Sequence, residues 1–136
     1  MESKSWVIFK NNGTFYMFYN HFDSYPMYPG LGDDLVFQIR KWDNNKIEEI
    51  KKLLYAIPLT NGEENIGRSS FDSFYKNLNH PIAYTYRTSN TNDIHKYMKC
   101  EYYYLIDLDD NKFTIEESIE NIKFTYSLFQ IPYQWW

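Results

Sequence analysis

The run Phe15–Phe22, FYMFYNHF, is the feature that most constrains the fold. In a β-strand, successive side chains point to opposite faces of the sheet. One face would carry Phe15, Met17, Tyr19 and His21, and the other Tyr16, Phe18, Asn20 and Phe22. Both sets are largely apolar. The run therefore predicts a strand in the middle of a sheet, or one covered on both sides.

The sequence before this run predicts its partner strand. SWVIFK, residues 5–10, is rich in aromatic and β-branched residues, and Asn12-Gly13 separates it from the apolar run. Asn-Gly is the preferred pair for the tightest hairpin turn, because both of its residues tolerate positive φ. We therefore predict that the chain begins with a β-hairpin.

The remaining elements follow from periodicity. Apolar residues at helical spacing predict helices over residues 33–43, 46–57 and 69–80, with Asp33 or Asp34 capping the first. Aromatic and β-branched runs predict strands over 82–88, 101–108 and 112–115, while 115–122 reads as a short helix or a polar-faced strand. We expect one α+β domain over residues 1–136: a mainly antiparallel sheet with about three helices packed on one face.

Composition excludes several classes of protein. The net charge is −4 and no basic block is present, which argues against a duplex nucleic acid partner. The single cysteine, Cys100, excludes an internal disulfide and a cysteine zinc cluster, and it reads as a bystander rather than a nucleophile. No apolar run has transmembrane length, so no membrane partner is expected. We expect a soluble cytoplasmic protein without a cofactor.

His21 and Asp23 are the candidate catalytic residues. Two positions apart on a strand, they would face the same way and could form an acid/base pair or share a metal. A third metal ligand would have to come from His80, His95, Asp107 or Asp109, and the spacing selects none of them. The plainer interpretation is that His21 ends the strand and Asp23 forms an Asx-turn. No metal site is therefore predicted.

The segment DSYPMYPGLG, residues 23–32, is the candidate recognition loop. Its prolines restrict the backbone, its glycines permit unusual conformations, and its tyrosines offer contact area. Arg68 in a glycine-containing loop, together with Arg87, could contact phosphate. The expected ligand-binding residues are Tyr19, His21, Asp23, Tyr25, Tyr28, Gly30, Gly32, Arg68 and Arg87. The acids at 107–111 lack the glycine and glutamate of a calcium loop, so we expect a hairpin turn there.

The stretch from Tyr19 to Leu35 resembles a family of small uncharacterised proteins of phages, other large DNA viruses and bacteria. Members begin with a hairpin and carry a tyrosine, a histidine or glutamine, roughly Asp-Gly-Tyr-Pro, a glycine-rich turn and a helix. The matching residues here are Tyr19, His21, Asp23, Tyr25, Pro26, Gly30, Gly32 and Leu35. Ser24 replaces the usual glycine, and Met27-Tyr28 lengthen the turn. The resemblance implies a viral or mobile-element origin, with a host cell as the location, and no particular reaction.

These observations favour a small non-enzymatic binding protein of viral or phage type. It would sequester a small nucleotide or a host protein in counter-defence. The alternatives are a hydrolase or phosphodiesterase that depends on His21 and Asp23, and a structural or virion-associated protein. Trp135 and Trp136 would form either a lid on the core or a homodimer contact.

Overall fold

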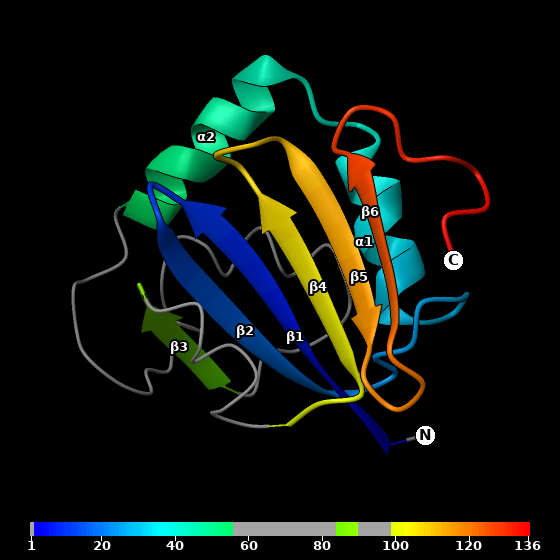
Figure 1. Cartoon of the computed structure of the whole chain (residues 1–136). Helices are drawn as coiled ribbons and strands as arrows, with labels where there is room; N and C mark the ends of the chain where they lie inside the picture. Colours follow the sequence, from blue (N-terminus) through cyan, green and yellow to red (C-terminus); the bar gives the residue numbers. More distant parts are fainter. Residues whose placement is uncertain (1, 56–83, 90–98) are drawn as a thin grey trace.

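The computed structural model describes residues 2–55, 84–89 and 99–136, which form one sheet and two helices (Figure 1). Six strands are hydrogen-bonded in the order β3-β2-β1-β4-β5-β6. The strands are β1 Glu2–Asn11, β2 Thr14–Phe22, β3 Tyr84–Thr88, β4 Tyr102–Asp107, β5 Lys112–Glu117 and β6 Ile122–Ser127. The helices are α1 Leu31–Ile39 and α2 Asn44–Tyr55.

The N-terminal hairpin is confirmed. β1 and β2 are antiparallel, and their register runs from Asn11 opposite Thr14 to Ser5 opposite Asn20. Asn12 and Gly13 have φ values of 52° and 73°, which is the conformation that a two-residue hairpin turn needs. The turn chemistry therefore sets the register of the first two strands.

The sheet is mixed rather than only antiparallel. β1 pairs with β4 in parallel, with Ser5 opposite Tyr102 and Lys10 opposite Asp107. The β1–β2, β2–β3, β4–β5 and β5–β6 pairs are antiparallel. Two antiparallel groups of strands thus meet at the parallel β1–β4 pair, which lies in the centre of the sheet.

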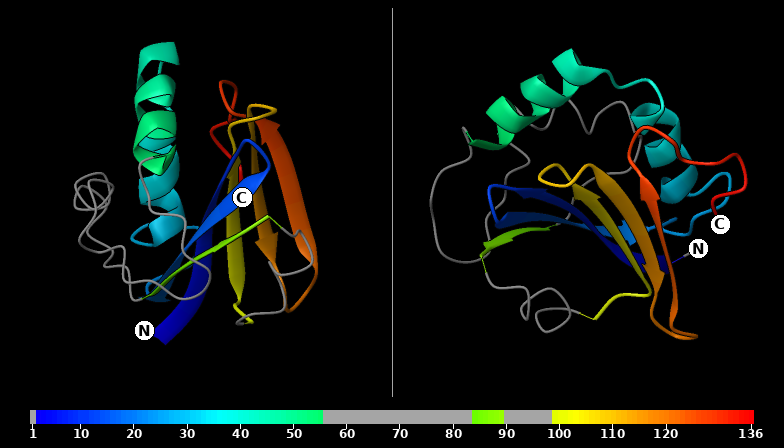
Figure 2. Two further views of the ribbon diagram at one scale, coloured as in Figure 1. Left: turned by 90° about the vertical axis from the view of Figure 1, so that its left-hand side faces the viewer. Right: turned by 45° about the horizontal axis from the view of Figure 1, so that its top comes forward.

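Both faces of β2 are buried, as the sequence predicted. Both helices lie on one side of the sheet (Figure 2). On that side Tyr16 and Phe18 join the main core with residues of α1 and α2. On the other side Phe15, Met17 and Tyr19 belong to a second cluster, which also contains Trp6 and Ile8 of β1.

The described helices differ in detail from those expected. α1 begins at Leu31, two residues earlier than the predicted range, and Gly30 is its N-cap without a side-chain hydrogen bond. Asp33 and Asp34 lie instead in the first turn, where a negative charge is favourable. The predicted helix at 69–80 lies outside the described residues. Neither α1 nor α2 is long and apolar enough to cross a membrane.

β6 was not predicted as a separate strand. The chain turns after β5 at residues 118–121 and pairs again with β5, so that Glu116 lies opposite Lys123 and Thr114 opposite Thr125. Of the two alternatives expected for 115–122, the helix is wrong, and the strand is correct at 115–117 and 122 but wrong at 118–121, which form the turn. After β6, residues 128–136 run back beside α1 on the helix side of the sheet (Figure 1).

Candidate functional site

The loop between β2 and α1, residues 23–30, is closed by its own backbone. Asp23, the residue after β2, has a φ of 51°, and the Tyr28–Pro29 bond is cis. Three N–H groups donate to carbonyls of the loop: Leu31 to Asp23 at 2.7 Å, Gly30 to Met27 at 2.6 Å, and Gly32 to Tyr25 at 3.2 Å. These bonds fix the loop in one conformation at the start of α1.

Buried contacts fasten the same loop to the sheet. The Ser24 N–H donates to Ser3 Oγ at 2.7 Å, and Tyr104 Oη donates to the Ser24 carbonyl at 2.6 Å. Tyr104 is completely buried, and this burial raises its pKa well above the ordinary value, so its hydroxyl stays protonated. The loop is therefore rigidly positioned, as a recognition surface requires.

His21 and Asp23 each have a tyrosine partner. His21 Nδ1 lies 3.0 Å from Tyr19 Oη, and their rings are 6.0 Å apart between centroids. Tyr25 Oη donates to Asp23 Oδ1 at 3.3 Å. Desolvation and the Asp23 carboxylate raise the pKa of Tyr25. The structure thus builds two local side-chain pairs at this end of β2.

The acids suggested as further metal ligands lie at the other end of the sheet. Asp107 is opposite Lys10, next to the hairpin turn, and its Oδ1 accepts the N–H groups of Asp109 and Asp110 at 3.0 Å. Asp107 and Asp109 therefore cannot meet His21. His80 and His95 lie outside the described residues. Over residues 2–55, 84–89 and 99–136, no group of three metal-binding side chains could hold an ion.

A groove of about 530 Å³ runs between the loop and the C-terminal segment. We call it the loop–tail groove. Its lining residues are Pro26, Met27, Tyr28, Asp33, Arg40, Tyr133, Gln134, Trp135 and Trp136. Three of the side chains are largely in water: Met27 is 67%, Tyr28 82% and Tyr133 89% exposed. Trp135 is buried, so the groove combines an aromatic floor with exposed aromatic walls.

The groove is also fixed on its C-terminal side. Arg40 Nη2, from the residue after α1, donates to the Pro132 carbonyl at 2.6 Å. Trp135 packs edge-on against Phe113 of β5, with ring centroids 5.7 Å apart, and its carbonyl accepts Tyr126 Oη at 2.7 Å. Both walls of the groove are thus held by buried or hydrogen-bonded groups.

The residues predicted to bind a ligand lie in different parts of the structure. Tyr28 lines the loop–tail groove, whereas Tyr19 lies in the cluster on the sheet face away from the helices. Gly30 and Gly32 are buried and serve close packing: a Cβ on Gly32 would lie 2.7 Å from Tyr104 Oη. Arg87 lies in β3 opposite Tyr16, and its side chain is outside the described part. Arg68 lies outside the described residues.

The sequence did not indicate that Asp33, Arg40, Tyr133 and Gln134 line a groove. Asp33 was predicted as a cap, and Arg40 lies in a predicted helix with ordinary periodicity. The C-terminal aromatics were noticed, but nothing local connects residues 133–136 with residues 26–28. The signal that the sequence does carry is that both segments combine proline with aromatic residues.

Cys100 is a buried structural residue. It belongs to the second cluster, and its N–H donates to Tyr103 Oη at 3.0 Å. Burial raises the pKa of its thiol to about 12. The thiolate is the form that reacts, and at neutral pH the folded protein contains very little of it.

We therefore expect Cys100 to resist alkylation. At pH 8, iodoacetamide should modify the folded protein about a hundredfold or more slowly than the protein unfolded in urea, whose thiol has an ordinary pKa. Intact mass measured over time gives both rates, and free glutathione serves as the control for the reagent. Equal rates in the folded and unfolded protein would show that Cys100 is accessible.

Three comparisons with known proteins bear on identity. No family model, no curated protein and no solved structure matches this chain. The resemblance to small phage and viral proteins therefore remains a prediction based on the loop motif.

Proposed function

We propose that this protein is a non-enzymatic binding protein and that the loop–tail groove is its recognition surface. The observation that carries the proposal is the exposure of Met27, Tyr28 and Tyr133 on a rigid backbone. Large apolar side chains that are exposed to water are stabilised when a partner covers them, so such a patch marks an interaction site. Tyrosine and methionine are also enriched where proteins contact one another.

The groove favours a protein partner over a small charged ligand. Among the described lining residues, one side chain is an acid, Asp33, and one is a base, Arg40, and their charges cancel for an approaching anion. The remaining lining is aromatic, aliphatic or amide. We infer that the partner inserts an extended segment with an apolar side chain, which would pack between Tyr28 and Tyr133. Because the groove is preorganised, little entropy is lost in ordering it.

Together with the loop motif, this suggests the biological role. A phage or viral protein of this size that captures a host protein would act in counter-defence, inside the host cell. The residues that we assign to binding are Tyr28 and Tyr133, with Met27 beside them. Tyr25 stabilises the loop through the hydrogen bond of its hydroxyl to Asp23.

The proposal is tested by a selection from a displayed library of random peptides. Peptides enriched on the wild-type protein should share an apolar anchor residue. They should bind the Tyr28→Ser/Tyr133→Ser variant at least about thirtyfold more weakly, since a central interface tyrosine contributes about 2 kcal/mol. Fluorescence polarisation with labelled peptide gives both affinities.

Tyr55→Ser provides the matched control. Tyr55 is also highly exposed, at 80%, but lies at the end of α2 and does not line the groove. This variant should bind the selected peptides as the wild type does. If the Tyr28→Ser/Tyr133→Ser protein retained full affinity, the groove would not be the recognition surface.

A further inference from the structure

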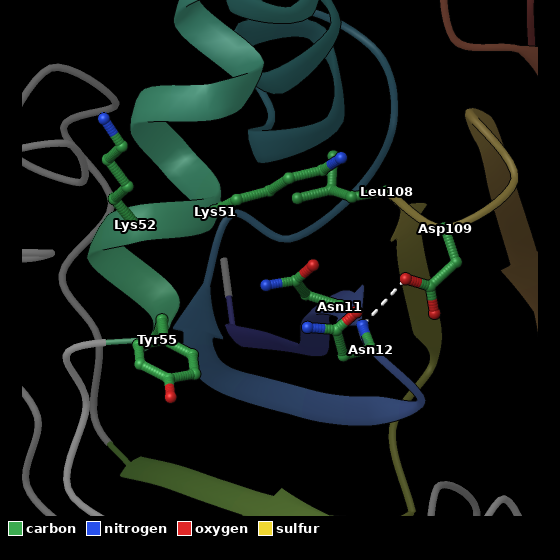
Figure 3. A pocket seen from close by; sticks show the side chains of 7 residues that line it. All are labelled: Asn11, Asn12, Lys51, Lys52, Tyr55, Leu108 and Asp109. Atoms are coloured by element: carbon green, nitrogen blue, oxygen red, sulfur yellow. Dashed lines mark hydrogen bonds between the residues drawn. The ribbon is translucent and has the colours of Figure 1, made fainter.

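A second pocket lies at the opposite end of the sheet, where α2 passes the β1–β2 hairpin (Figure 3). Its volume is about 490 Å³. Three regions of the chain contribute to its lining: Asn11 and Asn12 of the hairpin, Lys51, Lys52 and Tyr55 of α2, and Leu108 and Asp109 after β4. We call it the hairpin pocket. No residue in the described part of the chain lines both this pocket and the loop–tail groove.

The side chains present different chemistry from the groove. Lys51 extends from α2 towards Leu108, and the Asn11 amide lies beneath it between the helix and the hairpin (Figure 3). Leu108 is 2% exposed and Asn11 7% exposed, so both belong to the pocket floor. No side-chain hydrogen bond joins the Asn11 amide to another described residue. This nearly buried amide is therefore available to a ligand.

The charges favour an anion. Among the described residues that line the pocket, two are lysines and one, Asp109, is an acid. Both Asp109 oxygens already accept hydrogen bonds from the hairpin turn, from the Asn12 N–H at 2.7 Å and the Gly13 N–H at 3.0 Å. Lys51 also lies 3.5 Å from Glu48, which is largely exposed. Such a surface pair is weak and easily exchanged for a better partner.

Tyr55 adds a second kind of contact. Its ring is 80% exposed at one end of the pocket, on the side away from Asp109 (Figure 3). An exposed aromatic ring can stack on a planar base, and such stacking contributes about 1–3 kcal/mol per base. A lysine, a free amide and an exposed ring around one cavity match a phosphate attached to a planar heterocycle.

We propose that the hairpin pocket binds a nucleoside monophosphate. Lys51 and the Asn11 amide take the phosphate, Tyr55 stacks on the base, and Lys52 contributes long-range attraction from the rim. The phosphate monoester carries up to two negative charges, which the lysines complement, while its ring distinguishes it from a free inorganic anion. This site is independent of the proposed protein partner.

The test is a titration followed by ¹⁵N-edited NMR with three probes: adenosine 5′-monophosphate, inorganic phosphate and adenosine. The monophosphate should bind more tightly than either part alone and should shift the side-chain amide signals of Asn11. Lys51→Gln should weaken the binding of the monophosphate about tenfold or more, which is the loss expected for one hydrogen bond to a charged group. Lys46→Gln, on the same helix but outside the pocket, should leave the affinity unchanged.

Tyr55→Leu separates the two contacts. This substitution should weaken the binding of the monophosphate at least about fivefold, because the stacking contact is lost. It should leave the binding of inorganic phosphate unchanged. The proposal would be overturned if the Asn11 signals did not shift at about 10 mM monophosphate, a concentration at which even weak binding, with a Kd in the millimolar range, is detected. Equal affinity of the wild-type and Lys51→Gln proteins would overturn it too, and neither result would affect the groove experiment.

Discussion

Replacing Trp135 by alanine is expected to lower the free energy of unfolding by about 3–5 kcal/mol, the usual cost of removing a large aromatic side chain from a core. Trp135 is 6% exposed and belongs to the main core. Its ring packs on Phe113 and lies against the backbone of Gly32, whose added Cβ would be 2.9 Å from Cη2. Removing the ring empties the space between β5 and α1. Urea unfolding monitored by far-ultraviolet circular dichroism measures the loss.

Tyr133→Ala is the matched control for this substitution. It removes an aromatic ring from the same C-terminal segment, but this ring is 89% exposed, so stability should change by about 0.5 kcal/mol or less. If Trp135→Ala lowered the free energy of unfolding by less than about 1 kcal/mol, the effect would be close to that of a surface substitution. That result would show that the C-terminal segment does not complete the core. Of the two roles expected for the C-terminal tryptophans, Trp135 has that of a lid on the core.

Replacing Gly30 by alanine is expected to destabilise the protein by about 3 kcal/mol or more, because the loop has no room for a Cβ. The added atom would overlap the Tyr25 carbonyl oxygen and lie 2.6 Å from the Met27 carbonyl oxygen. Both neighbours are backbone atoms, so the loop itself must move. The φ of Gly30 is −80°, which any residue adopts, so the cost arises from space alone.

The same change should also damage the loop–tail groove. The Gly30 N–H bond to Met27 holds the part of the loop that presents Tyr28. Thermal melting measures the stability, and the selected peptides measure the groove. Met27→Ala, at an exposed position of the same loop, should leave the melting temperature nearly unchanged. A Gly30→Ala protein as stable as the wild type would mean that the loop tolerates a different conformation.

The sequence predicted the parts of the fold that depend on local chemistry. Asn12-Gly13 placed the hairpin because its two residues accept positive φ, and the apolar pattern of β2 predicted burial on both faces. The parallel β1–β4 pair was not predictable in the same way. It joins segments from opposite ends of the chain, and alternation of apolar residues says nothing about the direction of a partner strand.

β6 was missed although a local signal existed. The turn after β4 starts with an acid whose carboxylate caps it and ends at Asn111 with a φ of 54°. The turn after β5 repeats this design: Glu117 accepts the Ile119 N–H at 2.7 Å, and Asn121 has a φ of 55°. Comparing LDDN with SIEN would have identified a second hairpin of equal length.

The candidate sites were harder to predict than the fold. Tyr28 was identified because prolines and glycines mark the loop as unusual. The opposite groove wall was not, because it depends on how residues 133–136 pack over β5 and α1. The hairpin pocket likewise combines side chains of a helix, a hairpin and a distant turn. Surfaces assembled from segments distant in sequence leave no local pattern.

The parallel pairing of β1 with β4 also governs the order of events during folding. The β1–β2 hairpin and the β4–β5–β6 meander close through short turns, and such local closures take microseconds. Joining β1 to β4 must close a loop containing most of the chain, which costs entropy before any contact is gained. During synthesis, the backbone N–H and C=O groups on the edge of β1 that later faces β4 therefore stay unpaired until β4 has been made. Because an unpaired strand edge is a template for pairing with another chain, we expect aggregation to be most favoured during this interval.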